Sequence, residues 1–171
     1  MSDPPPTDAT MPPPATRWVR DRVDLRAAQA LRIRVFCDEQ GVSRELELDG
    51  RDEYARHGIA VADDGRVVGT IRLLTADDGR VVRVGRLAVD AAWRGRGIGR
   101  DLLRRAEGYA QSLGAHELRL AAQVDAVGLY LAAGYEQQGE PFEEAGIAHV
   151  WMVRDVPPAP RPSRGSAAGD R

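Results

Sequence analysis

Apolar and polar positions follow a period that changes in an orderly way along residues 17–156. The first group of apolar positions recurs at helical spacing: Ala28, Leu31, Val35 and Phe36. Asp24 precedes most of this group and Gly41 follows it. Aspartate accepts hydrogen bonds from the free amides at a helix start, and glycine adopts the positive φ of a helix end. The pattern therefore predicts a helix that is capped by Asp24 and ended by Gly41.

Three segments rich in valine, isoleucine and leucine come next and predict strands over 58–62, 66–74 and 80–89. Asp-Asp-Gly sequences between them supply the glycine that a hairpin turn needs. The remaining segments predict a helix over 98–113 that ends at Gly114, a strand around 118–122, a helix over 126–133, and strands over 135–139 and 147–154 on either side of a loop at Pro141. This order predicts an α/β (α+β) fold, with a mixed, mostly antiparallel central sheet and helices on both faces.

Proline content divides the chain into one domain and two tails. Ten of the 11 prolines lie in segments 1–16 and 157–171, which have few apolar side chains to bury. Such segments do not offset the entropy of ordering, so we expect one domain at 17–156 between two disordered tails. A role of the tails as proline-rich ligands is the alternative.

Composition excludes several kinds of chemistry. All 24 basic residues are arginine, which excludes a Schiff-base lysine, a pyridoxal-phosphate site and a P-loop. Cys37 is the single cysteine, so the chain forms no internal disulfide or thiolate zinc cluster and is expected to be cytoplasmic. The net charge of −2, the absence of metal-ligand spacings and the lack of a long apolar run lead us to expect no nucleic acid, no metal and no membrane partner.

A glycine-rich loop joins the third predicted strand to the long helix, with the sequence Arg94-Gly95-Arg96-Gly97-Ile98-Gly99-Arg100. Glycines let backbone amides converge, and the unpaired amides of a helix start favour an anion such as a pyrophosphate. A tight strand-to-helix turn that needs glycine only for packing is the alternative interpretation.

This loop resembles the R/Q-x-x-G-x-G/A signature of the GNAT superfamily of N-acetyltransferases, in which it holds the pyrophosphate of acetyl-coenzyme A. A second stretch, 123–135, is similar to the family's N-x-x-A-x-x-x-Y-x-x-x-G-F segment, with Gln123 in place of Asn and Tyr135 in place of Phe. The resemblance implies a GNAT-like fold and contacts to acetyl-coenzyme A from Leu87, Ala88, Val89, Arg94, Gly95, Arg96, Gly97, Ile98, Gly99, Arg100 and Gln123.

The same resemblance implies that Tyr130 is the general acid that protonates the departing thiolate, and packing of a half-buried aromatic side chain is the alternative. Many GNAT enzymes carry a glutamate base in the central strand, where this chain has Arg83. A protein base would then lie elsewhere, and the candidates, in falling order of preference, are Glu39, His149 and His57.

A finer resemblance points to the ElaA-like GNAT proteins and, more distantly, to the acyl-homoserine-lactone synthases. It rests on Arg32 and Phe36, on Glu47, Asp49 and Asp52, and on the stretches 69–72 and 85–86. It implies acceptor contacts from Phe36, Asp49, Arg72 and Arg86. An internal ion network is the alternative, because arginines in central strands are costly to bury unpaired and the carboxylates of 47–52 could reach them.

We therefore expect an acetyl-coenzyme A dependent N-acetyltransferase that acts on a primary amine of a small molecule or peptide. Transfer of a longer acyl group and a non-catalytic module that binds coenzyme A are the alternatives, and a homodimer is compatible with the sequence. The acidic segment 44–53 would attract a cationic amine if it forms a wall of the acceptor pocket, and it would otherwise be a solvated loop.

Overall fold

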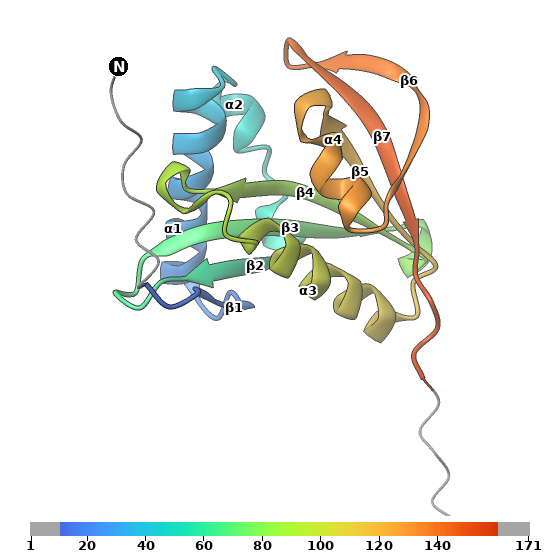
Figure 1. Ribbon diagram of the computed structural model, residues 1–171, viewed down its shortest axis with the longest axis horizontal. Coiled ribbons are helices and arrows are strands. Elements are labelled where there is room, and N and C mark those ends of the chain that lie inside the picture. The colour runs from blue at the N-terminus through green and yellow to red at the C-terminus, as the bar shows by residue number, and fades with distance from the viewer. Residues whose placement is uncertain (1–10, 161–171) are drawn as a thin grey trace, which may run out of the picture.

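A seven-stranded sheet organises the part of the chain that the computed structural model describes, residues 11–160 (Figure 1). Its strands are β1 (Ala15–Trp18), β2 (Arg56–Val61), β3 (Val67–Ala76), β4 (Val81–Val89), β5 (Glu117–Gln123), β6 (Glu136–Glu144) and β7 (Ile147–Asp155). They lie in the order β1-β2-β3-β4-β5-β7-β6, and every neighbouring pair is antiparallel except β4 and β5. The predicted mixed, mostly antiparallel sheet is confirmed.

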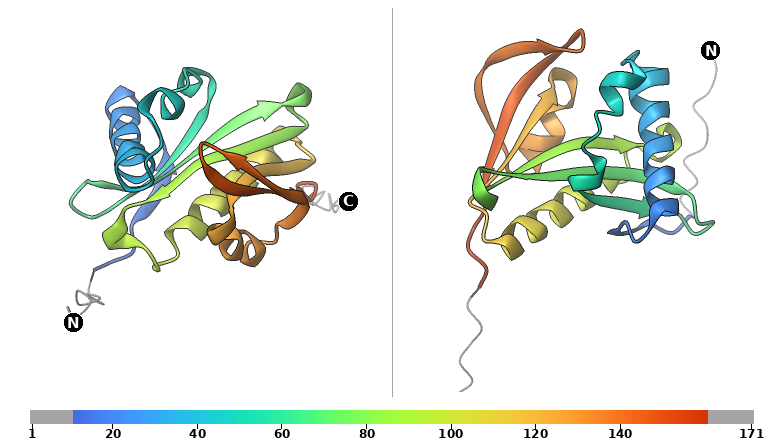
Figure 2. Two further views of the ribbon diagram at one scale, coloured as in Figure 1. Left: turned by 90° about the horizontal axis from the view of Figure 1, so that it is seen from above. Right: turned by 180° about the vertical axis from the view of Figure 1, so that it is seen from behind.

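Helices cover both faces of this sheet, as predicted (Figure 2). They are α1 (Arg22–Arg32), which continues as the π-helix η1 (Ile33–Glu39), α2 (Arg44–Glu47), α3 (Ile98–Leu113) and α4 (Val127–Ala132). In Figure 2 the blue and cyan helices α1 and α2 lie on one face, and α3 and α4 lie on the other. None of the helices in residues 11–160 is both long and apolar enough to span a bilayer.

The main hydrophobic core lies between the sheet and α3. Leu102, Ala106 and Ala110 recur at helical spacing along α3, and all three are fully buried. They belong to the same cluster as Ile71 of β3 and Leu118 of β5. Since strand side chains alternate between faces, the residues next to Leu118 point away from α3, toward the face that carries α1.

Local differences from the predicted elements have simple physical causes. The helix α1 is capped by Asp21, whose side chain accepts a hydrogen bond from the Asp24 amide at 2.9 Å. Asp24, the predicted cap, instead binds the guanidinium of Arg17 and the amide of Arg20. This pairing holds the pKa of Asp24 well below its usual range, the hydrogen bond from Arg17 being the main cause.

Two other boundaries differ. Pro141 lies inside β6 rather than in a loop, at an irregularity where the register with β7 shifts between Gln138 and Phe142. An edge strand tolerates proline because one of its sides has no partner strand. At the other end of the chain, β1 begins at Ala15, inside the segment 1–16 that we assigned to the tail. The remaining residues of both predicted tails are described only for 11–14 and 157–160.

The parallel pair β4 and β5 separates along its length, and this separation positions the site. The two strands pair only over residues 81–83 and 117–119. Beyond Arg83 no pairing joins them, and the gap between their ends is visible in Figure 1. The backbone groups that face each other across this gap are left without strand partners.

Candidate active site

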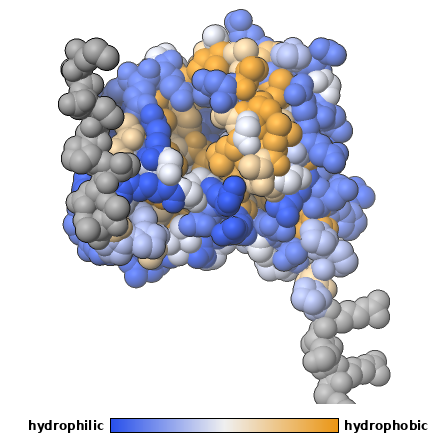
Figure 3. All heavy atoms as spheres, in the orientation of Figure 1, coloured by the Kyte–Doolittle hydropathy of each residue, from blue (hydrophilic) through white to orange (hydrophobic). Residues whose placement is uncertain are grey.

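A cavity of about 720 Å³ occupies the gap between β4 and β5. Figure 3 shows it as a hollow in the middle of the molecule, bordered on one side by an apolar surface. The lining side chains come from η1 and α2 on one face of the sheet and from α3 and α4 on the other. The cavity therefore reaches both faces of the sheet.

A β-bulge in β4 shapes the middle of the cavity. Gly85 pairs with Arg72 of β3, yet the next paired positions are Ala88 and Thr70, so β4 holds one extra residue there. Arg86 has a φ of 52°, which is a left-handed conformation that non-glycine residues rarely adopt. A bulge bends its strand, and the predicted cofactor residues of β4, Leu87, Ala88 and Val89, line the space where β4 and β5 no longer pair.

The glycine loop lies at the cavity, and Arg94, Gly95 and Gly97 are among the lining residues. Gly97 caps α3 with a φ of 80°, and a Cβ placed there would meet no heavy atom within 4 Å. Gly95 is similar, with a φ of 76° and the same open surroundings. Amides of the first α3 turn have no intrahelical partners. An anionic group thus has room to approach these amides.

Arginines of the loop differ in what they contact. Arg94 lines the cavity but is held by the Val89 carbonyl at 3.1 Å and by the Glu39 carboxylate at 2.8 Å. The guanidinium of Arg96 lies over the Trp93 ring, 4.9 Å from its centroid. Arg100 is exposed and lines the cavity. Of the loop arginines, Arg100 is therefore the one with a free approach to a bound phosphate.

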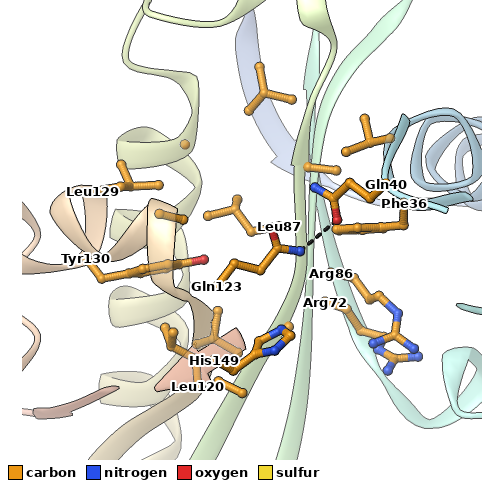
Figure 4. A pocket seen from close by; sticks show the side chains of 18 of the residues that line it. Phe36, Gln40, Arg72, Arg86, Leu87, Leu120, Gln123, Leu129, Tyr130 and His149 are labelled. Carbon is orange, nitrogen blue, oxygen red and sulfur yellow. Dashed lines mark hydrogen bonds between the residues drawn. The ribbon is translucent and has the colours of Figure 1, made fainter. Parts of the chain in front are cut away.

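Tyr130 lies on α4 with its hydroxyl pointing into the cavity (Figure 4). The residue is 9% exposed, and burial raises its pKa to about 12. A phenol with this pKa is protonated at neutral pH, so in a proton transfer it acts as an acid and not as a base. The placement fits the predicted general acid, and the same side chain also packs in the core against Tyr135.

His149 is the candidate base that faces the cavity. Its Nδ1 lies 2.7 Å from the Ile147 carbonyl oxygen, and its ring stacks on Phe142. Since a carbonyl only accepts, Nδ1 carries the hydrogen and Nε2 of the neutral ring is left as a proton acceptor. Figure 4 shows the ring between Tyr130 and the arginine side of the cavity.

The other two base candidates do not line the cavity. Glu39, which the sequence ranks first, forms an ion pair with Arg94 at 2.8 Å. His57 is buried, and its Nε2 lies 2.9 Å from the Asp52 carbonyl oxygen. The geometry therefore favours His149 over both.

Arg72 of β3 and Arg86 of β4 take part in the ion network that the sequence raised as the alternative to acceptor contacts. Three arginines and three carboxylates form it: Arg32, Arg72, Arg86, Glu47, Asp49 and Asp52. Arg72 binds both oxygens of Asp49, at 2.7 and 2.8 Å, and this pairing holds the pKa of Asp49 well below its usual range. Arg72, Arg86 and Phe36 also line the cavity, whereas Asp49 does not.

This network changes the expected role of the acidic segment 44–53. Its carboxylates at 47, 49 and 52 are neutralised by arginines, and Glu47 is 2% exposed. Only Leu46 and Glu47 of the segment line the cavity. The segment therefore supplies part of the cavity wall, and its two remaining carboxylates, Glu45 and Glu53, are exposed and do not line the cavity.

Several lining residues escape prediction from the sequence. The Gln40 carboxamide accepts a hydrogen bond from Gln123 at 2.7 Å and so joins η1 to the end of β5 (Figure 4). Arg119 of β5 and Trp151 of β7 also line the cavity. Their positions depend on which strands are neighbours, and only a signal of strand pairing would have revealed them.

Comparisons with known proteins agree with this geometry. The family described as acetyltransferase (GNAT) domain matches residues 24–156. The UPF0039 protein Rv2851c of Mycobacterium tuberculosis is 36% identical over 144 residues, which cover 80% of this chain and 89% of that protein. The uncharacterized N-acetyltransferase YjcF of Bacillus subtilis is 32% identical over 137 residues, 80% of this chain and 96% of that protein.

Solved structures support the fold and the finer resemblance. Escherichia coli ElaA superposes with a TM-score of 0.71 at 27% identity, over 82% of this chain and 99% of ElaA. The resemblance to the GNAT superfamily, with ElaA among the structural neighbours, is thus confirmed. Family match, sequence relatives, fold and cavity lead to one conclusion: the chain belongs to the GNAT family of acetyltransferases.

Proposed function

We propose that the protein transfers the acetyl group of acetyl-coenzyme A to a primary amine, with Tyr130 as general acid. The observation that carries this proposal is the cavity between β4 and β5, which has the glycine loop at one end and the Tyr130 hydroxyl in its middle. GNAT acetyltransferases use acetyl-coenzyme A, so membership of this family supports acetyl-coenzyme A as the cosubstrate.

Binding of acetyl-coenzyme A would use backbone groups more than side chains. Its pantetheine arm is an extended chain with two amides, and the free edges of β4 and β5 offer donors and acceptors at strand spacing. Its pyrophosphate would meet the amides near Gly97 and the first turn of α3, with Arg100 adding a full charge. The thioester would then lie beside Tyr130.

The chemistry requires one bond to form and one to break. The neutral amine nitrogen bonds to the thioester carbon, and the carbon–sulfur bond breaks with its electron pair on sulfur. Tyr130 donates its proton to that sulfur, which gives the free thiol. The nitrogen loses a proton to His149 Nε2, and this proton returns to the phenolate through solvent, so both groups end as they began.

A thiol-release assay with a set of amines tests the proposal. Wild-type chain with acetyl-coenzyme A should release free coenzyme A only when an amine is present, and mass spectrometry should find the acetamide. A parallel series with butyryl- and octanoyl-coenzyme A reports whether a longer acyl group is preferred. Tight binding of acetyl-coenzyme A with no release for any amine would instead favour a non-catalytic binding module.

A further inference from the structure

Two arginines on the far side of the cavity have no role in the proposed mechanism. Arg83 of β4 and Arg119 of β5 are register partners in the short parallel pairing, so they lie side by side on one face of the sheet. Both line the cavity. Val82 and Leu118, the residues before them, are buried in the core on the α3 face, so the two arginines point to the other face.

Counter-charges do not fully neutralise this pair. Arg119 is held by the Glu117 carboxylate at 2.7 Å. Arg83 is exposed and forms no hydrogen bond or ion pair with another side chain of residues 11–160. Asp155, the β7 register partner of Glu117, is exposed and also forms no ion pair within that range. Directly paired like charges repel each other in a sheet, so a further anion beside Arg83 and Arg119 would be stabilised.

An apolar path leads from this pair to the catalytic groups. Ala121 follows on the same face of β5 and pairs with Trp151 of β7, whose ring stacks on Phe142 at 5.2 Å. Gln123 comes next and pairs with His149. A strand rises about 3.3 Å per residue, so the backbone of Arg119 lies about 13 Å from that of Gln123.

No helix of residues 11–160 covers this part of the face. The helices α1 and α2 lie over β3 and the near end of β4, and Figure 2 shows the face of β5 and β7 beyond them without a helix. An acceptor can therefore enter from this side while acetyl-coenzyme A lies against α3 and α4. It would place its amine near His149 and any anionic group near Arg83.

We propose that the acceptor is an amine that also carries a carboxylate, with a short apolar chain between the two groups. Arg83 and Arg119 bind this carboxylate. The inference rests on the proposed function. The Arg83 guanidinium has no carboxylate partner in residues 11–160, so a carboxylate of the acceptor can pair with it in two-point geometry. Arg72 and Arg86 do not compete for it, because the ion network already neutralises them. The preference is opposite to the one that an unpaired acidic segment 44–53 would impose.

A matched substrate series tests the subsite. Straight-chain amino acids of increasing length, with the amine at one end and the carboxylate at the other, would be compared with the corresponding carboxamides, and initial rates of thiol release are the readout. We expect kcat/KM to be at least ~10-fold higher for the carboxylate of the best length, since a hydrogen bond to a charged group contributes more than a neutral one. The preference should shrink as ionic strength rises.

Variants assign the preference to the two arginines. Arg83→Gln and Arg119→Gln should each raise KM for the carboxylate about 10-fold. Neither should change KM for the carboxamide or for acetyl-coenzyme A. Arg80→Gln is the control, because Arg80 is exposed just before β4 and does not line the cavity. Melting temperatures of all variants verify folding.

The outcomes separate the subsite from the proposed function. Transfer to amines with equal kcat/KM for carboxylates and carboxamides would overturn the subsite and leave acetyl transfer standing. If no amine is acetylated, the proposed function fails, and calorimetric titration of the same compounds into the complex with coenzyme A still tests the arginines. Tighter binding of carboxylates that Arg83→Gln abolishes would support the subsite, and equal binding would overturn it.

Discussion

Two tyrosines that touch each other differ in what their hydroxyls face. The rings of Tyr130 and Tyr135 meet edge to face with centroids 5.9 Å apart. The Tyr130 hydroxyl points into the cavity (Figure 4), whereas the Tyr135 hydroxyl is buried with no hydrogen-bond partner in residues 11–160. Burial raises the pKa of both phenols, so neither is ionised at neutral pH. Only Tyr130 is placed to donate a proton to a ligand.

Removal of the Tyr130 hydroxyl should therefore affect catalysis, and removal of the Tyr135 hydroxyl should affect stability. Tyr130→Phe should lower kcat by about 10²–10⁴-fold with little change in the Kd of acetyl-coenzyme A, because the proton is donated in the transition state. Tyr135→Phe is the matched control: it should leave kcat unchanged and raise the free energy of unfolding by up to about 1 kcal/mol, because a buried unpaired hydroxyl is removed. Wild-type kcat in Tyr130→Phe, with chemistry limiting the rate, would assign Tyr130 to packing.

His57 should make stability depend on pH. Burial lowers its pKa, although the carbonyl and carboxylate of Asp52 favour the charged ring. The unfolded chain, with a histidine pKa of about 6.5, therefore binds the proton more readily than the folded chain. The stabilising contribution is complete above that pH and is lost as the pH falls from it toward the folded pKa.

Urea unfolding of wild type and His57→Gln, at about pH 7.5 and about pH 5.5, measures this contribution. The free energy of unfolding should fall more in wild type than in His57→Gln on acidification, because the variant has no ring to protonate. All other side chains are the same in the two chains, so the difference between the two losses reports on His57 alone. Equal losses in the two chains would show that His57 does not contribute.

At the scale of elements, the loop and the start of α3 act together. The positive φ of Gly97 would strain any larger residue there, so a glycine variant would not separate cofactor binding from folding. Arg100 and Arg104 provide a cleaner comparison. Both are exposed on α3, but only Arg100 lines the cavity, and Arg104 pairs with Asp101 at 3.3 Å.

Arg100→Ala should raise the Kd of acetyl-coenzyme A by up to about 10-fold, equivalent to about 1.4 kcal/mol, because a charge beside the pyrophosphate is lost. Its Kd for S-acetylpantetheine, which lacks the phosphates, should not change. Arg104→Ala should leave both values as in wild type. Calorimetry gives the four constants, and equal weakening of both ligands by Arg100→Ala would show that the arginine does not act on the phosphates.

The sequence predicts elements well where their signals are local. The turn glycines Gly65 and Gly79 and the helix end at Gly114 all adopt positive φ, and the long helix spans the predicted residues. The loop predicted at Pro141 is wrong, because a strand at the edge of a sheet cannot be recognised before its neighbours are known. The bulge at Arg86 likewise depends on register with β3. Local pattern thus defines the strands, and only their pairing defines the cavity.

The candidate site residues were likewise predictable from local sequence motifs but not where they depend on strand pairing. The loop of 94–99 and Tyr130 lie in contiguous motifs, and Tyr130 and every residue of the loop except Arg96 line the cavity. Glu39 ranks first among the base candidates from the sequence, and the structure pairs it with Arg94, which is distant in sequence. Arg83 and Arg119 become neighbours only through a parallel pairing. Long-range contacts therefore decide which charged groups are free.

At the scale of the whole molecule, the cavity between β4 and β5 forms a passage from one face of the sheet to the other. Gly97 and Tyr130 line the cavity from the α3 and α4 face, while Leu46 and Trp151 line it from the other face. Two substrates can thus approach the gap between β4 and β5 from opposite sides and meet in it. No cysteine, serine or threonine is among the described residues that line the cavity.

This arrangement predicts direct transfer within a ternary complex. Cys37 lies in η1 outside the cavity lining, and burial raises the pKa of its thiol, so it is a poor acceptor for the acetyl group. Initial rates measured over a grid of acetyl-coenzyme A and amine concentrations should give intersecting double-reciprocal lines, and Cys37→Ala should keep the wild-type kcat. Parallel lines, or a protein that gains an acetyl group when incubated with acetyl-coenzyme A alone, would mean that a side chain carries the group between substrates, as ping-pong kinetics require. The passage would then serve each substrate in turn rather than both together.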